Sequence, residues 1–182
     1  GMMGRTQPLH IYAHADLEKL LRPLLDYHCQ ELTYEVEFRA INPRKKEVIF
    51  QDRTLTIETI PLKHKVPTCG FLFIEHHRDK ASRKRYAYCS DTAYREKIVE
   101  QIEGVDVLFH EATYTEKDAD KCKKHTHSTA KQAAQIAKLA GVGKLVLGHF
   151  SAREDDHNVF LNEAKEIFEN TVLAVEKEII EI

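Results

Sequence analysis

Two histidines stand two residues apart in the segment KHTHSTAKQAA, which covers residues 124–134. His125 and His127 have the His-x-His spacing of many metal-ligand pairs, and they come just before a segment with helical periodicity. A neutral imidazole binds metal ions, whereas a protonated imidazole can donate a proton in acid catalysis. The spacing therefore leaves three interpretations open: a metal site, a proton donor, or an ordinary helix start.

Other side chains of the ligand type follow apolar segments that we predict to be buried strands. Asp91 follows RYAYCS, His110 follows VDVLF, and His149 follows KLVLG. Because ligands of α/β folds gather at the carboxyl ends of strands, we expect these side chains to lie close together. His64 also follows an apolar strand, in PLKHKVPTCG, and it is either a metal ligand or a surface histidine between two lysines.

Alternating strands and helices must position these residues, so we predict an α/β fold. Strands are predicted near residues 8–13, 34–41, 47–50, 55–62, 70–75, 85–90, 105–112 and 144–151, with a last strand or two after residue 168. Helices are predicted over residues 16–27, 94–102, 128–140 and 160–168. Thr129 and Gln132 have capping-box spacing, Ser128 is an alternative cap, and Gly141 is a usual C-terminal cap. His127 therefore stands in the turn before a helix.

The composition is that of an ordinary globular protein. The chain has 182 residues, of which 42% are hydrophobic and 31% charged, and its formal net charge of −2 does not indicate a nucleic-acid partner. No run of 18 apolar residues is present. The four cysteines form no C-x-x-C pair, so we expect no structural zinc knuckle and a reduced, cytoplasmic protein. No linker or repeat is visible, and residues 1–182 are predicted to belong to a single domain.

Four segments together form one pattern: TIPLKHKVPTCGFLF, YAYCSDT, VDVLFHEATY and HSTAKQAAQIAKLAGVGKLVLGHFSAR. This pattern resembles the C-terminal part of ribonuclease Z, the tRNA 3′-processing endonuclease of the metallo-β-lactamase superfamily. The resemblance runs along nearly the whole chain. It implies an αββα sandwich, a site for two zinc ions with manganese or iron as alternatives, and a homodimer.

The resemblance also implies roles for individual residues. His64, Asp91 and His149 would be metal ligands, with Asp91 bridging the two ions. His127 would protonate the leaving oxygen, and Glu111 would orient His127 or a ligand. A hydroxide shared by the metals would attack the phosphodiester, and the cut would remove the 3′ trailer from precursor tRNA.

Two features depart from the family pattern. The main ligand motif of the family, H-x-H-x-D-H, is absent from the 182 residues. We therefore expect the C-terminal part of a longer protein, in which this chain alone has a partial or empty metal site and does not cleave RNA. The loop at residues 76–85 is short and stands where many relatives carry a tRNA-binding arm. Its cations either contact RNA or are simply solvated: Arg78, Lys80, Arg83, Lys84 and Arg85.

Two other functions stay open on the sequence alone. The same fold and metals could serve another phosphodiesterase, because a missing arm weakens the argument for tRNA. The chain could also be a non-catalytic RNA-binding or dimerisation module, although such a module has no use for Asp91, His127 and His149. A sandwich that lacks one part is expected to expose an apolar face.

Overall fold

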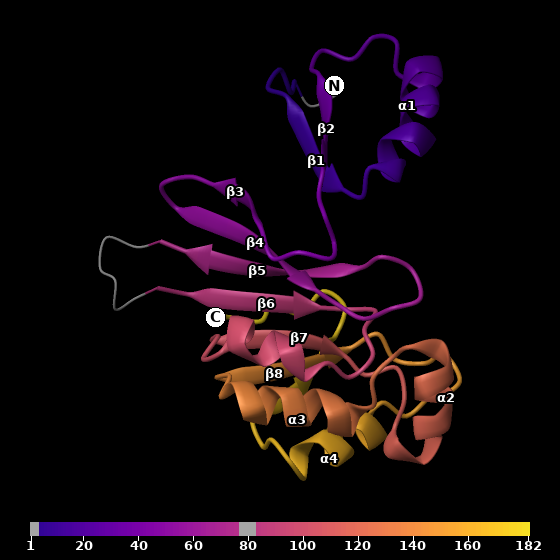
Figure 1. The fold of residues 1–182 in the computed structure, drawn as a ribbon, viewed down its shortest axis with the longest axis vertical. Helices are drawn as coiled ribbons and strands as arrows, with labels where there is room; N and C mark the ends of the chain where they lie inside the picture. The colour runs from indigo at the N-terminus through magenta and orange to yellow at the C-terminus, as the bar shows by residue number, and fades with distance from the viewer. Residues whose placement is uncertain (1–3, 77–82) are drawn as a thin grey trace. The chain divides into compact units, whose positions relative to one another are not determined.

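A computed structural model describes residues 4–76 and 83–182 of the chain. The chain divides into two compact units, residues 1–42 and residues 43–182. Each unit has its own β-sheet, with two strands in the first unit and seven in the second (Figure 1).

The first unit is a βαβ arrangement. The parallel strands β1 (Leu9–Ala13) and β2 (Val36–Ala40) are connected through the helix α1 (Asp16–His28). Helix α1 confirms the helix that the leucine spacing predicted. None of the residues of α1 is buried. Leu20 is 69% exposed and Leu24 is 55% exposed. The helix therefore presents an apolar face that the described residues leave open.

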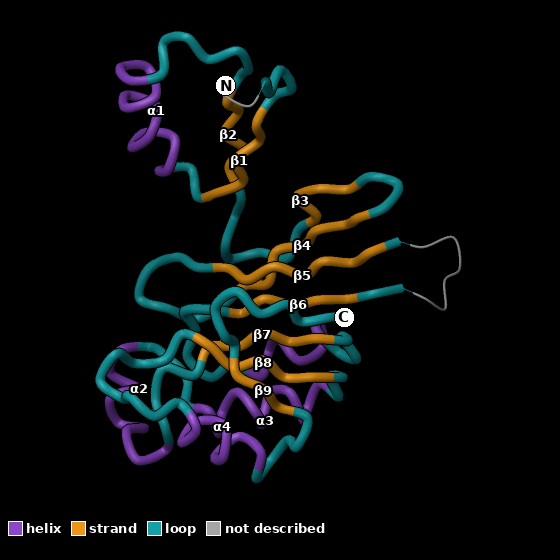
Figure 2. The backbone as a smooth tube through the Cα atoms, turned by 180° about the vertical axis from the view of Figure 1, so that it is seen from behind, coloured by secondary structure: helices purple, strands orange, loops and turns teal. Residues whose placement is uncertain are grey.

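The second unit is built on a seven-stranded mixed sheet, whose strands lie in the order of the sequence (Figure 2). They are β3 (Val48–Gln51), β4 (Leu55–Pro61), β5 (Cys69–Glu75), β6 (Arg85–Cys89), β7 (Val107–Glu111), β8 (Lys144–Gly148) and β9 (Thr171–Leu173). Strands β3 to β6 pair antiparallel, and strands β6 to β9 pair parallel. The carboxyl ends of β6, β7 and β8 therefore meet at one edge of the sheet, where the sequence predicted a site.

Two α-helices, α3 (Ala130–Ala140) and α4 (Asn158–Lys165), pack against the β7–β9 part of this sheet. The 3₁₀ helix η2 (Glu96–Ile102) contacts α3 and β4, while the short η3 (Glu116–Asp118) and α2 (Ala119–His125) precede α3. Figure 1 shows α3 and α4 next to each other beside β7 and β8. Within the part of the chain that the structure describes, no helix has the length and apolar character of a membrane span.

The start and end of α3 confirm the capping prediction. Thr129 accepts a hydrogen bond from the backbone N–H of Gln132, and the Gln132 side chain accepts one from the backbone N–H of Thr129. Gly141 ends the helix with φ 59°, a left-handed conformation that glycine adopts without strain. A buried face of small residues lets α3 lie close to the sheet, with Ala130, Ala133, Ala134, Ala137 and Ala140.

The core lies between these helices and one face of the sheet. Leu72, Ala87 and Leu108 are paired across β5, β6 and β7, and all three are buried on this face. The opposite face carries aromatic rings, where Phe73 stacks on Tyr86 and Tyr88 stacks on Phe109 with centroids 5.7 Å and 4.7 Å apart. Tyr88 is 38% exposed, so the described residues cover this aromatic face only in part.

The four cysteines are free in the structure. Cys29 and Cys69 are half-buried, whereas Cys89 and Cys122 are buried. Burial raises the pKa of Cys89 and of Cys122 to about 12 in each case. These two thiols are therefore unreactive at neutral pH.

Candidate metal centre

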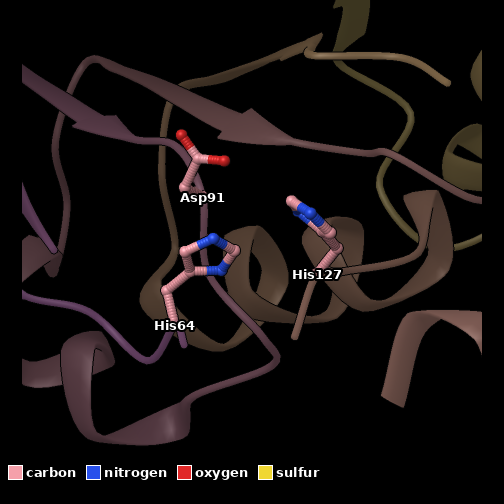
Figure 3. A group of neighbouring side chains, drawn as sticks. All are labelled: His64, Asp91 and His127. Atoms are coloured by element: carbon pink, nitrogen blue, oxygen red, sulfur yellow. The ribbon is translucent and has the colours of Figure 1, made fainter. Parts of the chain in front are cut away.

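Four of the predicted site residues come together at the carboxyl edge of the seven-stranded sheet. His64 follows β4, Asp91 follows β6, His149 follows β8, and His127 lies between α2 and α3. Figure 3 shows that His64, Asp91 and His127 come from separate segments, and one ligand atom of each lies within 4.8 Å of the others. Oδ1 of Asp91 lies 3.3 Å from Nε2 of His149. Asp91 therefore lies close to both His64 and His149.

Glu111 lies beneath this cluster at the end of β7, with its side chain 0% exposed. Its Oε1 accepts hydrogen bonds from the backbone N–H of Thr92 at 2.6 Å and from Nδ1 of His127 at 2.8 Å. Its Oε2 accepts from Oγ1 of Thr113 at 2.6 Å and from the backbone N–H of Ser128 at 3.1 Å. These bonds use the roughly four lone-pair positions of a carboxylate. Glu111 is therefore an anchor for its neighbours.

Two of the site histidines are held at Nδ1 in the tautomer that binds metal ions. Nδ1 of His64 lies 3.0 Å from the carbonyl oxygen of Thr126, which can only accept, so Nδ1 carries the proton. Nδ1 of His149 lies 2.9 Å from Oγ1 of Thr113, whose own proton goes to Glu111, so this Nδ1 also donates. A neutral imidazole that is protonated at Nδ1 has its lone pair at Nε2. Metal-binding histidines usually have such a partner for the other ring nitrogen.

Glu111 also controls the charge of His127. The hydrogen bond from His127 to Glu111 is the main reason that the pKa of His127 lies above its ordinary value. Burial alone would raise the pKa of Glu111, but hydrogen bonds from His127, Thr113 and Ser128 outweigh burial and lower this pKa. The pair therefore favours an imidazolium beside an ionised carboxylate.

The backbone is left-handed at three points of the site. The φ angle is 57° at Asp91, 61° at Thr126 and 60° at His149. Among the other described residues that are not glycine, only Lys177 has a positive φ. Such conformations cost energy and persist where the surroundings hold them, often at functional sites.

Hydrogen bonds tie the loops of the site to one another. Oγ of Ser128 donates to the carbonyl oxygen of Thr92 at 2.6 Å. The backbone N–H of Lys63 donates to Oγ1 of Thr92 at 3.1 Å. Thr92 thus links the loop that carries His64 to the loop that carries His127, and the site forms one connected network.

Two other histidines that the sequence made candidates, His110 and His125, lie outside this cluster. His110 lies inside β7, is 1% exposed, and has an Nε2 atom without a hydrogen-bond partner among the described residues. Successive side chains of a strand face opposite sides, so Glu111 reaches the site and His110 does not. Burial lowers the pKa of His110. The pKa of His125 is also lowered, first by desolvation and then by Lys65 and Lys124.

The cations predicted to contact RNA belong to the connection between β5 and β6. Arg78 and Lys80 lie outside the described residues. Arg83 and Lys84 are exposed. The guanidinium of Arg85 donates to the backbone carbonyl that follows η2, at 2.6 Å. Arg85 therefore supports the fold, and RNA contact stays a prediction for all five cations.

The donor set fits a zinc-type ion. Ligand atoms of His64, Asp91 and His127 lie within 4.8 Å of one another, and so do those of Glu111, His127 and His149, while Asp91 lies beside His149. Imidazole nitrogens and carboxylate oxygens are ligands that zinc, manganese and iron all accept. The sequence did not predict Thr113 or Thr126, which hold the two imidazoles. Both are threonines in loops, and their part in the site depends on contacts with residues 36 and 62 positions away.

Comparison with known proteins first defines the class. A family model described as the beta-lactamase superfamily domain matches residues 2–150. The short form of human tRNase Z has the same fold with a TM-score of 0.75 at 24% identity, over 99% of this chain and 70% of that one. A diphosphatase from the PhnP family gives a TM-score of 0.60 at 17% identity, over 92% and 56% of the two chains. The protein therefore has the metallo-β-lactamase fold, as predicted.

Relatives in sequence then identify the family within this fold class. The ribonuclease Z of Phocaeicola vulgatus is 44% identical over 219 aligned positions, which cover 97% of this chain and 71% of the relative. The ribonuclease Z of Azobacteroides pseudotrichonymphae is 44% identical over 208 positions, which cover 100% of this chain and 72% of the relative. The chain belongs to the ribonuclease Z family. Both alignments are longer than the 182 residues of this chain, so both relatives have additional residues within the matched region.

Proposed function

We propose that residues 1–182 are the C-terminal part of a zinc-dependent endonuclease that removes the 3′ trailer from precursor tRNA. The convergence of His64, Asp91 and His149 beside the His127–Glu111 pair is the observation that carries this proposal. Membership of the ribonuclease Z family supports the choice of substrate.

In this proposal, His64, Asp91 and His149 hold the metal ions. The tautomers of the two histidines leave Nε2 free on each ring, and Oδ1 of Asp91 lies next to one of these nitrogens. Bound zinc would supply an activated water and electrostatic stabilisation for phosphodiester hydrolysis.

His127 is the proton donor in this proposal, and Glu111 is its positioning residue. Hydrolysis that leaves a 3′-hydroxyl on the tRNA needs a proton on the departing 3′-oxygen. Glu111 holds Nδ1 of His127 at 2.8 Å, which directs the Nε2 proton toward the space shared with Asp91 and His64. The hydrogen bond to Glu111 raises the pKa of His127, which favours the protonated form that can donate.

Basic side chains around the site suit a polyanionic substrate. Lys63, Lys65 and Lys124 are exposed next to His64 and His125, and the last two of these lysines act on the pKa of His125. Phosphates of an RNA strand would neutralise such charges, which contributes affinity that falls as salt increases.

The ligands named here do not complete a two-metal site. The 182 residues contain no H-x-H-x-D-H motif, which the family resemblance leads us to expect as the source of the remaining ligands. We therefore expect the 182-residue chain alone to bind zinc weakly and to leave RNA intact.

The direct test compares the chain with a version extended by a segment that bears H-x-H-x-D-H. Both are incubated with zinc and either a precursor tRNA with a 3′ trailer or a small phosphodiester such as bis-p-nitrophenyl phosphate. We expect trailer removal by the extended version only. Robust turnover by the shorter chain would contradict the expected inactivity. Hydrolysis of the small ester without tRNA cleavage would favour another phosphodiesterase, and RNA binding without either reaction would favour a non-catalytic module.

A variant separates the role of His127 from that of a ligand. In the extended protein, His127→Ala should lower turnover while zinc content stays nearly unchanged, because Nε2 of this residue serves the proton and not the metal. Loss of zinc from this variant would make His127 a ligand instead.

A further inference from the structure

Thr126 ends helix α2 in a conformation that a threonine rarely adopts. Its φ and ψ angles are 61° and 46°, and its backbone N–H donates to the carbonyl oxygen of Cys122 as in an ordinary helix cap. Helix α3 ends in the same conformation with Gly141, which has no side chain to strain. A β-branched residue is unfavourable at such a position. The helix end alone therefore does not explain a threonine here.

The contacts of Thr126 with His64 offer an explanation. Its carbonyl oxygen lies 3.0 Å from Nδ1 of His64, and its Oγ1 lies 3.1 Å from the same nitrogen. The hydroxyl proton of Thr126 is directed to the carbonyl oxygen of His125, so Oγ1 has lone pairs left to accept the proton of Nδ1. Both acceptors of one residue thus hold one ring nitrogen.

The left-handed backbone makes this double contact possible. Thr126 and His64 are 62 positions apart in the sequence, so the contact joins two separate loops of the site. Asp91, the neighbour of His64 in the cluster, is also left-handed. Two residues near His64, Asp91 and Thr126, therefore have a left-handed backbone.

We propose that Thr126 is a positioning residue for His64, and that its hydroxyl is retained at the expense of fold stability. The hydroxyl and the carbonyl together keep the proton of His64 on Nδ1 and aim Nε2 at the space shared with Asp91 and His127. The inference rests on the proposed function only where it takes His64 as a metal ligand.

Three substitutions in the 182-residue chain separate strain from positioning. Thr126→Gly removes the Cβ that strains the left-handed backbone together with the hydroxyl, Thr126→Ala removes the hydroxyl and the γ-methyl group but keeps Cβ, and Thr126→Ser keeps the hydroxyl. Lys177→Gly is the matched control, because Lys177 also has a positive φ, at 70°, and lies exposed in the C-terminal segment.

Three measurements compare these variants with the unchanged chain. Thermal unfolding should show Thr126→Gly melting about 2–4 °C above the unchanged chain, because relief of strain stabilises the fold. Nitrogen-15 NMR of the zinc-free protein at pH 8 should show the Nδ1–H tautomer of His64 in the unchanged chain and in all three variants, because the carbonyl oxygen of residue 126 remains. The Nδ1–H proton of His64 should exchange with water faster in the Gly and Ala variants, which lack the second acceptor, than in the unchanged chain and in Thr126→Ser. Titration with Zn²⁺ alone should show about tenfold weaker binding for the Gly and Ala variants, as for loss of a partner that orients a metal-binding histidine. Lys177→Gly should change neither the exchange of this proton nor zinc binding.

The inference is overturned if the Nδ1–H proton of His64 exchanges with water in Thr126→Gly and Thr126→Ala at the rate of the unchanged chain. It is also overturned if Thr126→Gly melts at or below the temperature of the unchanged chain, because no strain would then have been retained. If the unchanged chain binds no zinc, the proposed function fails, but the exchange of the His64 Nδ1–H proton still decides the role of Thr126.

Discussion

Replacing Glu111 by glutamine tests the network that holds the site together. The substitution keeps the shape of the side chain but removes its charge and turns one acceptor oxygen into an NH₂ donor. Each carboxylate oxygen of Glu111 accepts one hydrogen bond from a backbone N–H and one from a side chain. The outcome therefore depends on which oxygen the NH₂ group replaces.

Both orientations of the glutamine leave a backbone donor unpaired. If the NH₂ group takes the place of Oε1, it faces the N–H of Thr92, and if it takes the place of Oε2, it faces the N–H of Ser128. His127 could change its tautomer and Thr113 could rotate its hydroxyl, but a backbone N–H can do neither. An unpaired buried donor costs about 1–3 kcal/mol, and loss of the charge weakens the remaining bonds. We expect Glu111→Gln to lower the free energy of unfolding by about 2–4 kcal/mol.

Thermal and urea unfolding of the zinc-free chain measure this change. A loss of about 2–4 kcal/mol should lower the melting temperature by roughly 5–15 °C for a chain of this size. Glu103→Gln is the control, because Glu103 is exposed and should tolerate the same chemical change within about 0.5 kcal/mol. Equal melting temperatures for Glu111→Gln and Glu103→Gln would refute the hydrogen-bond argument.

Two further predictions concern residues beside the site. His110 is buried and its pKa is lowered, so the folded protein holds it neutral while the unfolded chain binds a proton below about pH 6.5. The stability that neutral His110 contributes is present above that pH and is lost as the pH falls, and His110→Leu should make the decline between pH 7 and 5 shallower, by at most about 1.4 kcal/mol per pH unit. An unchanged slope in urea unfolding would show that His110 is protonated in the folded state. Gly70→Ala should destabilise the second unit by about 1–3 kcal/mol, because a Cβ atom would lie 2.3 Å from the carbonyl oxygen of Tyr88 on the neighbouring strand. Unfolding at the same urea concentration as the unchanged chain would contradict this contact.

The regular elements with a strong pattern were predictable from the sequence. Thr129, Gln132 and Gly141 have side-chain chemistry that marks the ends of a helix locally, and α3 begins and ends where they indicate. Helix α2 was not predicted, because Cys122 is its only buried residue and a helix without an apolar stripe leaves no periodic signal. The segment at residues 94–102 was predicted as a helix, and its later part is a 3₁₀ helix, a distinction that apolar spacing does not make.

For the site, the sequence predicted which ligand-type residues follow the strands, but not which side chains hold them in place. Asp91 and His149 come together as expected, because parallel strands bring their carboxyl ends to one edge. His110 fulfilled the same pattern but faces the core, since one residue of register decides which side chain reaches the edge. Thr113 and Thr126 could not be predicted, because their roles depend on distant partners and, for Thr126, on an unusual φ angle.

The central claim is that Asp91 belongs to a metal site, and a zinc titration of the 182-residue chain against a competing chelator tests it most directly. Asp91→Asn is the informative variant, because asparagine accepts the left-handed backbone of this position, keeps the shape of the side chain, and removes the charge and one of the two oxygens. His14→Ala, which removes an exposed histidine of the first unit, is the control. We predict weak zinc binding that falls at least about tenfold in Asp91→Asn and stays unchanged in His14→Ala. Equal zinc affinity for Asp91→Asn and the unchanged chain would contradict the account.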